Sequence, residues 1–214
     1  MNNEISMQLP FNTPNPFDAL SVEQFKEHLK NREIWINGPI TERLVDTLYM
    51  NLINLNSASN SIPITVMINS LGGNLFESFV ATDMMATIQA PITTVALANI
   101  CSGGFILFMG GKHRVIHENT NIMIHSAGFS TTDKIPMISE HLNYLKLTMD
   151  RMEHFFETQT GVPYKFWKEI VDSGKERYFT AEEALKLRIA HQIIGRPKPP
   201  EPRKPYTWDL APTM

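Results

Sequence analysis

Hydrophobic and polar positions follow two different periods along the first half of the chain. Short apolar runs typical of strands occupy residues 33–37, 63–69 and 92–98, while helical spacing fills residues 41–55 and 74–90. The run PITVMIN (63–69) is apolar enough to predict a strand buried on both faces of a sheet. Strands that alternate with helices of this length indicate an α/β fold of parallel β-α-β units.

The second half is predicted to begin with a strand that ends at Ser102, where glycines open a helix within residues 99–111. Two short strands follow at 114–116 and 121–124, and from about residue 131 the chain becomes helical. One apolar stripe then predicts a helix of about 20 to 25 residues. Its members are spaced by three and four: Ile135, Ile138, Leu142, Leu145, Met149, Met152 and Phe156. Such a helix either overhangs its domain as an oligomer interface or packs on the domain, and both interpretations stay open.

The last elements are a short helix ending near Val171, a strand at Tyr178 and Phe179, a helix over 180–188 and a strand over 191–194.

The two ends of the chain lack this periodicity. Residues 1–20 contain three prolines and predict an extended N-terminal arm, and Ser21 is predicted to cap a short helix over 21–30. After Gly195 the proline-rich stretch 196–214 predicts an extended C-terminal tail. One domain is therefore expected over residues 21–195.

Composition narrows the functional classes. The 214 residues are 43% hydrophobic with a net charge of −3 and no basic block, which disfavours nucleic acid as a partner. No apolar run reaches the roughly 18 to 20 residues of a membrane helix, and the first residues lack a secretion signal, so we expect no membrane association. Cys101 is the single cysteine, so a disulfide or a cysteine-based metal site is not expected, nor is any cofactor. The expected location is the cytoplasm.

The candidate chemistry begins at Ser102, where a strand gives way to a helix. A serine hydroxyl needs a base, a group that orients the base, and N–H donors for the developing oxyanion. Gly103 and Gly104 permit a tight turn that exposes the hydroxyl and leaves the Gly103 N–H free. The sharper hydrolase turn has a further glycine where this chain has Ile100, so the motif alone is a weak signal.

Other candidates end neighbouring strands. Gly72 and Gly73 follow the strand at 63–69 on the edge where ligand sites of open α/β sheets gather, so Gly73 is either a second oxyanion donor or part of a plain turn. His125 ends the strand at 121–124 and is a candidate base, with a core or surface histidine as the alternative. Asp172 follows a helix and is either the orienting carboxylate or an ordinary helix-end residue. Cys101 is a weak rival nucleophile, because its usual role is that of a small buried side chain.

Read together, these motifs resemble the ClpP family of serine peptidases from about Lys30 to Gly195. The matching landmarks, in order and spacing, are NGPI, INSLGG, CSGGFIL, GGKHRVIHENTNIMIH, the long helix and DSGKERYFTAEEAL. The resemblance implies a ClpP/crotonase-like fold of stacked βαβ units with a protruding helical handle, and two stacked heptameric rings. It also implies the following site residues: Ser102 as nucleophile, His125 as general base and then acid, Asp172 as the orienting carboxylate, and Gly73 and Gly103 as oxyanion donors.

The chain departs from that family in two places. After the histidine, Ser126, Ala127, Gly128 and Phe129 replace the stretch that pairs with bound peptide, so this segment is the expected substrate-binding strand with an altered preference. The positions through which the family docks an AAA+ unfoldase carry no Phe, Tyr or Trp side chain, which makes such a partner a weaker expectation. These positions correspond to Thr65, Met67, Thr87, Val115 and His117, which are expected to face outward.

The favoured hypothesis is a serine endopeptidase that hydrolyses peptides and unfolded proteins inside a homo-oligomeric chamber. A phage-type head maturation protease would use the same chemistry on capsid precursors. A crotonase-like acyl-CoA enzyme would share the pair of backbone donors but would not need Ser102, His125 and Asp172. A non-catalytic ring subunit would lack one of these three residues, and none is missing.

Overall fold

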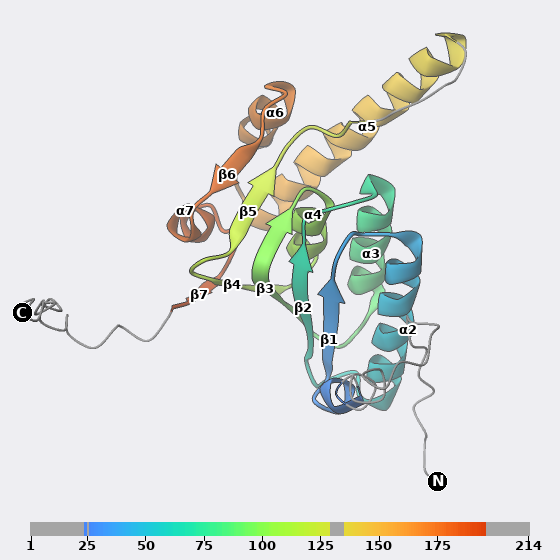
Figure 1. Cartoon of the computed structure of the whole chain (residues 1–214), viewed down its shortest axis with the longest axis vertical. Coiled ribbons are helices and arrows are strands. Elements are labelled where there is room, and N and C mark those ends of the chain that lie inside the picture. The colour runs from blue at the N-terminus through green and yellow to red at the C-terminus, as the bar shows by residue number, and fades with distance from the viewer. Residues whose placement is uncertain (1–23, 25, 129–134, 196–214) are drawn as a thin grey trace, which may run out of the picture.

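A computed structural model gives a mixed α/β fold with a mainly parallel sheet, and it describes residues 24, 26–128 and 135–195 (Figure 1). The strands are β1 (Glu33–Asn37), β2 (Ile64–Ser70), β3 (Ile92–Cys101), β4 (His113–His117), β5 (Asn121–Ile124), β6 (Arg177–Phe179) and β7 (Gln192–Ile194). The helices are α2 (Glu42–Ala58), α3 (Leu75–Thr87), α4 (Gly103–Met109), α5 (Ile135–Thr160), α6 (Tyr164–Asp172) and α7 (Ala181–Lys186). The alternation predicted from the sequence is confirmed.

The expected N-terminal arm (1–20), the proline-rich tail (196–214) and the capping serine at position 21 lie outside the described residues. Of the helix expected over 21–30, residues 24 and 26–30 are described and helical. The other helix starts follow from local chemistry. Thr41 and Asn74 accept hydrogen bonds from the first turns of α2 and α3, and Thr180 forms a reciprocal capping box with Glu183 at α7.

The sheet branches at its longest strand, β3. The strand order is β1-β2-β3-β4-β7, all in parallel pairs, and the end of β3 also pairs with β5. Thr93–Ala96 of β3 pair with β4, and Asn99–Cys101 pair with β5. The remaining strand, β6, pairs with β5 and runs antiparallel to it. As a result, β2, β3 and β5 end at one edge of the sheet, which is where the candidate site residues follow.

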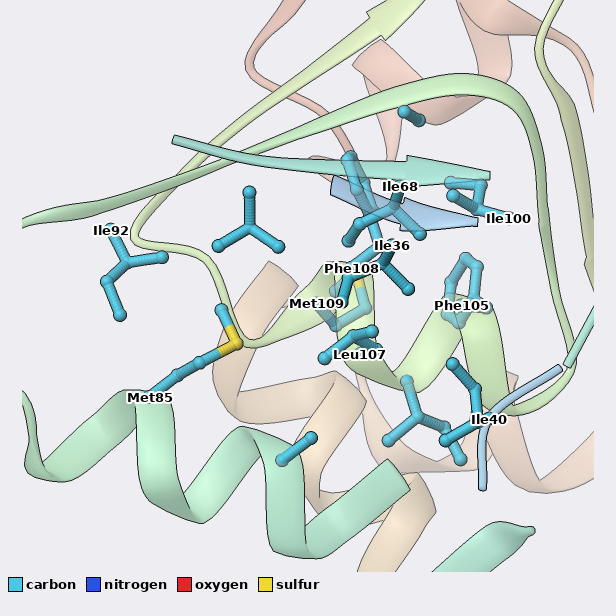
Figure 2. Packing of buried hydrophobic residues seen from close by; sticks show 14 of the residues in the cluster. Ile36, Ile40, Ile68, Met85, Ile92, Ile100, Phe105, Leu107, Phe108 and Met109 are labelled. Carbon is cyan, nitrogen blue, oxygen red and sulfur yellow. The ribbon is translucent and has the colours of Figure 1, made fainter. Parts of the chain in front are cut away.

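The hydrophobic core lies between the sheet and helices α2, α3 and α4. Ile36, Ile68 and Ile100 come from three adjacent strands, and Figure 2 shows them beside Phe105 and Phe108 of α4. Every residue of α4 is buried, as expected for a helix that is apolar on all sides. This packing holds α4, and with it the turn at Ser102, in a fixed position behind the sheet.

The prediction that β2 is buried on both faces is wrong. Ile64, Val66 and Ile68 are buried, whereas Thr65, Met67 and the other alternate positions are only partly covered. Helices cover the first face, and the second face carries the polar and longer side chains of the strand. Within the described residues, one face of this mainly parallel sheet is therefore left without a covering layer, which is unusual for such sheets.

The long helix α5 has 26 residues, and both of its expected roles find support in different halves (Figure 1). Met152 and Phe156 in the second half are buried in the core, so this half packs on the domain. In the first half Leu142 and Leu147 are 39% and 58% exposed. The first half thus projects from the domain with an apolar surface that the described part of the chain does not cover.

A buried arginine joins α5 to the far edge of the sheet. Arg114 of β4 is 2% exposed and donates hydrogen bonds to the carbonyls of Gly111, Gln159, Arg188 and Ile189 at 2.8–2.9 Å. Burial lowers its pKa to about 10, so the guanidinium remains charged at neutral pH. One side chain therefore satisfies carbonyls at the end of α5 and after α7 that would otherwise be buried without partners.

Candidate active site

Ser102 and His125 lie together at the shared strand edge, as the sequence predicted. The Oγ atom of Ser102 and the Nε2 atom of His125 are 2.9 Å apart, a hydrogen-bond distance. Ser102 directly follows β3 and His125 directly follows β5, and these strands pair in parallel up to Cys101 and Met123. The pairing of β3 with β5 therefore places the Ser102 hydroxyl next to the His125 imidazole.

The backbone at Ser102 has a conformation that non-glycine residues seldom adopt. Its φ is 52° and its ψ is −123°, and its N–H donates to the carbonyl of Met123 at 2.9 Å. This sharp turn connects the strand to α4 and presents the hydroxyl at the first turn of the helix. The N–H of Gly103, the first residue of α4, has no intrahelical acceptor.

The glycine pair after β2 packs directly on that turn. A β-carbon at Gly72 would lie 2.7 Å from the Cβ of Ser102, and one at Gly103 would lie 3.3 Å from the nitrogen of Gly73. Gly72 also has a φ of +110°, which favours glycine. The N–H of Ile40 donates to the Gly72 carbonyl, and the Ile40 carbonyl accepts a hydrogen bond from the N–H of Asn74. No described residue accepts a hydrogen bond from the Gly73 N–H. Two unpaired backbone donors thus stand near the serine hydroxyl.

A row of asparagine side chains crosses the sheet just before these turns. Asn69 donates to Asn37 at 2.8 Å, Asn99 donates to Asn69 at 3.0 Å, and Asn121 donates to Asn99 at 3.0 Å. The row links β1, β2, β3 and β5 on the face that the helices do not cover. We refer to these four residues as the asparagine row.

The hydroxyl opens into a cavity of about 350 Å³, within the size range of ligand sites. Its polar end is formed by the serine, the histidine and the backbone of the two glycine turns. The rest of the lining is mainly apolar and comes from α3, α4, β5 and α5: Leu75, Phe76, Ile106, Ile124, Leu145, Met152 and Phe156. The cavity can accept an apolar side chain beside a reacting carbonyl group.

Cys101 does not compete with the serine. Its side chain is buried, and Sγ lies 3.7 Å from the carbonyl oxygen of Asn121. Burial, followed by the charge of Glu176, raises the pKa of the thiol. A buried thiol with little thiolate is a poor nucleophile.

Asp172 is not joined to His125 by a hydrogen bond within the described residues. It is the last residue of α6, its side chain is 58% exposed, and it pairs with Lys168 one turn earlier at 3.2 Å. Ile124 lies opposite Arg177 in the β5–β6 pairing, so the backbone of Glu176 lies beside that of His125. Three residues separate Asp172 from Glu176, which limits the span between their Cα atoms to about 14 Å. Asp172 is thus close in the chain to the histidine's neighbour but is held by a lysine.

The comparison with protein families decides the identity of the chain. The profile of the Clp protease family matches residues 18–197. The chain belongs to the Clp protease family. It is a ClpP-like peptidase, and none of these matches favours the crotonase-like or the phage-type alternative.

Curated members of the Clp protease family are similar over most of the chain. The ATP-dependent Clp protease proteolytic subunit of Deinococcus radiodurans is 25% identical over 178 residues, which cover 82% of this chain and 86% of that protein. Proteolytic subunit 1 of Salinibacter ruber is 26% identical over 173 residues, or 80% and 73% of the two chains. The solved structure of a ClpP1 mutant from Listeria monocytogenes covers 81% of this chain and 96% of its own, with a TM-score of 0.72 and 23% identity, and it shows the same fold.

The segment expected to bind substrate is placed in part. Ala127 and Gly128 line the cavity, Ser126 is half-buried beside it, and Phe129 lies outside the described residues. The segment continues from β5 past His125, along the opening of the cavity.

The positions expected to correspond to the family's unfoldase-docking residues differ in exposure. Thr87 is exposed, and Thr65, Met67 and His117 are partly exposed. Val115 is in register with Val95, which is in register with Met67, so Val115 lies on the same sheet face as Met67 but is only 6% exposed. The role of these positions stays a prediction.

Sequence reasoning did not find Lys168 or the apolar lining of the cavity. Ile106 lies one helical turn after Ser102 and could have been found from that spacing. Lys168 lies four residues before Asp172, a spacing that signals a helical ion pair. Within the described residues no helix is long and apolar enough to cross a membrane, and no cluster of ligating side chains suited to a metal ion is found.

Proposed function

We propose that this chain is a serine endopeptidase in which Ser102 is the nucleophile, His125 the general base and then acid, and Asp172 the orienting carboxylate. Gly73 and Gly103 supply the oxyanion donors. The substrates are peptides and unfolded proteins. The observation that carries the proposal is the 2.9 Å distance between Ser102 Oγ and His125 Nε2, at a strained turn that opens into a mainly apolar cavity.

The reaction follows from these positions. His125 Nε2 takes the hydroxyl proton as Ser102 Oγ attacks the substrate carbonyl, and the resulting oxyanion accepts hydrogen bonds from the two glycine N–H groups. His125 then returns the proton to the departing amine, which leaves an acyl group on the serine. A water molecule, deprotonated by the same histidine, attacks the acyl group and releases the second product.

The glycine turns support the oxyanion assignment. Gly73 and Gly103 lie on separate strand ends that pack against each other, and a β-carbon on either residue would meet nearby backbone atoms. Donors fixed in this way need no rearrangement when charge develops on the oxygen, which is why they contribute strongly to catalysis. The positive end of α4 adds to the same effect.

The assembly we propose is a homo-oligomer of two stacked heptameric rings. Two observations support an oligomer: a sheet face that no described helix covers, and the exposed apolar residues in the first half of α5. The curated relatives are proteolytic subunits of ATP-dependent proteases. Because the docking positions carry no Phe, Tyr or Trp side chain, the proposal does not include a particular AAA+ unfoldase. The proposed location is the cytoplasm.

The decisive experiment is covalent labelling with a fluorophosphonate, followed by mapping of the adduct and a native mass measurement. We expect one adduct on Ser102, no adduct in Ser102→Ala, and a mass near fourteen times the 24.4 kDa of the subunit. Ser102→Ala should assemble normally and lose cleavage of fluorogenic peptides by several orders of magnitude. Unlabelled Ser102 in an assembled, folded protein would refute the nucleophile, and a monomeric mass would refute the assembly.

A further inference from the structure

Two carboxylates compete for one ammonium group beside the candidate site. Lys168 Nζ on α6 lies 3.2 Å from Asp172 Oδ2 and 4.0 Å from Glu153 Oε2 on α5. Asp172 is largely exposed to water, whereas the side chain of Glu153 is only 2% exposed. Lys168 is therefore the cation shared between the two helices.

Glu153 has a clear need for that cation. Its Oε2 atom is buried and has no hydrogen-bond partner among the described residues, and a buried unpaired carboxylate oxygen is costly. Burial raises the pKa of this carboxyl. A small rotation of the lysine side chain would bring its ammonium within hydrogen-bond reach of Glu153, since 4.0 Å is just beyond that reach.

Asp172, in contrast, must be released from Lys168 before it can act. The proposed mechanism requires its carboxylate at His125, yet it is bound to Lys168, and the hydrogen bond to Asp172 is the main cause that raises the pKa of Lys168. The turn after Asp172 contains Gly174, whose φ is +66° and whose surroundings are open. This short exposed turn leads directly to Glu176 beside His125, so a released Asp172 side chain lies at the start of the segment that reaches the histidine.

We propose that Lys168 is a positioning residue that passes between Asp172 and Glu153, and that its transfer to Glu153 frees Asp172 to orient His125. The inference rests on the proposed function and names the step that completes its triad. Lys168 touches neither substrate nor serine and acts through Asp172. Lys168, Asp172 and Glu153 line a surface pocket, and the other charged groups in its lining are Lys146 and Asp150, both on α5.

Two substitutions should move activity in opposite directions. Lys168→Met frees Asp172, so kcat for a short fluorogenic peptide should rise about two- to fivefold with KM unchanged, the range by which an exposed helical ion pair shifts an equilibrium. Glu153→Gln removes the competing charge and leaves Lys168 on Asp172, so kcat should fall by a similar factor. Lys168→Arg keeps the cation and should restore the wild-type kcat.

The chain offers a matched control on the same helix. Lys165 pairs with Glu169 at 3.9 Å with the same four-residue spacing, and both side chains are exposed. Lys165→Met should leave kcat and KM unchanged. If Lys168→Met does not fold, the double variant Lys168→Met/Glu153→Gln leaves no buried charge unpaired and should show the same rise in kcat.

The failure of this inference can be told apart from failure of the peptidase itself. In an Asp172→Asn background, Lys168→Met should have no effect, because the lysine acts only through Asp172. If Ser102 is labelled by the fluorophosphonate and Asp172→Asn loses activity, but Lys168→Met leaves kcat unchanged or lowers it, the role of Lys168 is overturned and the triad stands. If Ser102 is not labelled, the proposed function fails first.

Discussion

Gly72 and Ser102 come from different strand ends, yet a β-carbon on the glycine would stand 2.7 Å from the β-carbon of the serine. The same added atom would lie 2.9 Å from the carbonyl oxygen of Cys101. The turn that carries the proposed nucleophile thus packs directly against the glycine turn on the next strand. A larger side chain in one turn should therefore displace the other.

The first prediction concerns this contact. Gly72→Ala should lower kcat by about 100-fold or more, because the added methyl group must push the serine turn away from His125 and misplace the reacting atoms. Peptide hydrolysis and thermal unfolding would be measured together. Gly195→Ala is the control, since its added carbon meets nothing within 4 Å. A fully active Gly72→Ala protein would contradict the geometry described for the turn.

The second prediction separates two acidic residues near His125. Asp172→Asn should lower kcat by about 10³- to 10⁴-fold, the loss seen when the orienting carboxylate of a triad is neutralised. Glu176→Gln should stay within about twofold of wild type, because that carboxylate accepts a hydrogen bond from the Tyr178 hydroxyl at 2.8 Å. The reverse order of effects would assign the orienting role to Glu176 instead.

The third prediction concerns Cys101, the residue next to the proposed nucleophile. Because burial raises the pKa of its thiol, little thiolate is present near pH 7, and the side chain is enclosed. Alkylation by iodoacetamide in the native protein should be at least about 100-fold slower than in urea-unfolded protein. Rapid native alkylation, followed by mass spectrometry, would show that this thiol is available for chemistry.

The fourth prediction links Glu153 to stability. Burial raises the pKa of the Glu153 carboxyl in the folded state. The wild-type protein therefore loses stability as the pH rises from the pKa of this carboxyl in the unfolded chain through its higher pKa in the folded protein. Glu153→Gln does not titrate. Its Tm should exceed that of wild type at neutral pH by about 2 to 4 °C, the shift produced by about 1 kcal/mol in a chain of this size.

The difference in Tm between the two proteins should disappear below about pH 4, where Glu153 of the wild type is protonated and as neutral as the glutamine of the variant. Glu169→Gln is the control, because Glu169 lies on an exposed surface. A Tm difference that is the same at every pH would show that the glutamine acts by packing and not by removing a charge.

The sequence predicted the strand ends well because turn chemistry is local. Glycines at 72 and 73 and the glycines after Ser102 indicate sharp turns, and the histidine at 125 marks the end of an apolar strand. Each feature alone left alternatives open, and the order and spacing shared with the ClpP family brought Ser102 and His125 into one expected site.

What the sequence could not predict depends on competition or on register. The hydrophobicity of residues 63–69 does not say whether a second layer covers them, and no described residue forms such a layer. Asp172 could be foreseen near the site, but its choice between His125 and Lys168 is decided by a balance of weak interactions between exposed charges. The contacts of Arg114 join residues up to 77 positions apart and leave no periodic signal.

The asparagine row has a consequence for how the strand ends move. Hydrogen bonds between its side-chain amides connect four strands. Each asparagine lies about three residues before a segment that contributes to the site. A slip of one strand by a single residue would turn its amide to the other face and break the chain of ties on both sides. The glycine and serine turns therefore cannot slide past each other unless the hydrogen bonds between these side-chain amides are broken first.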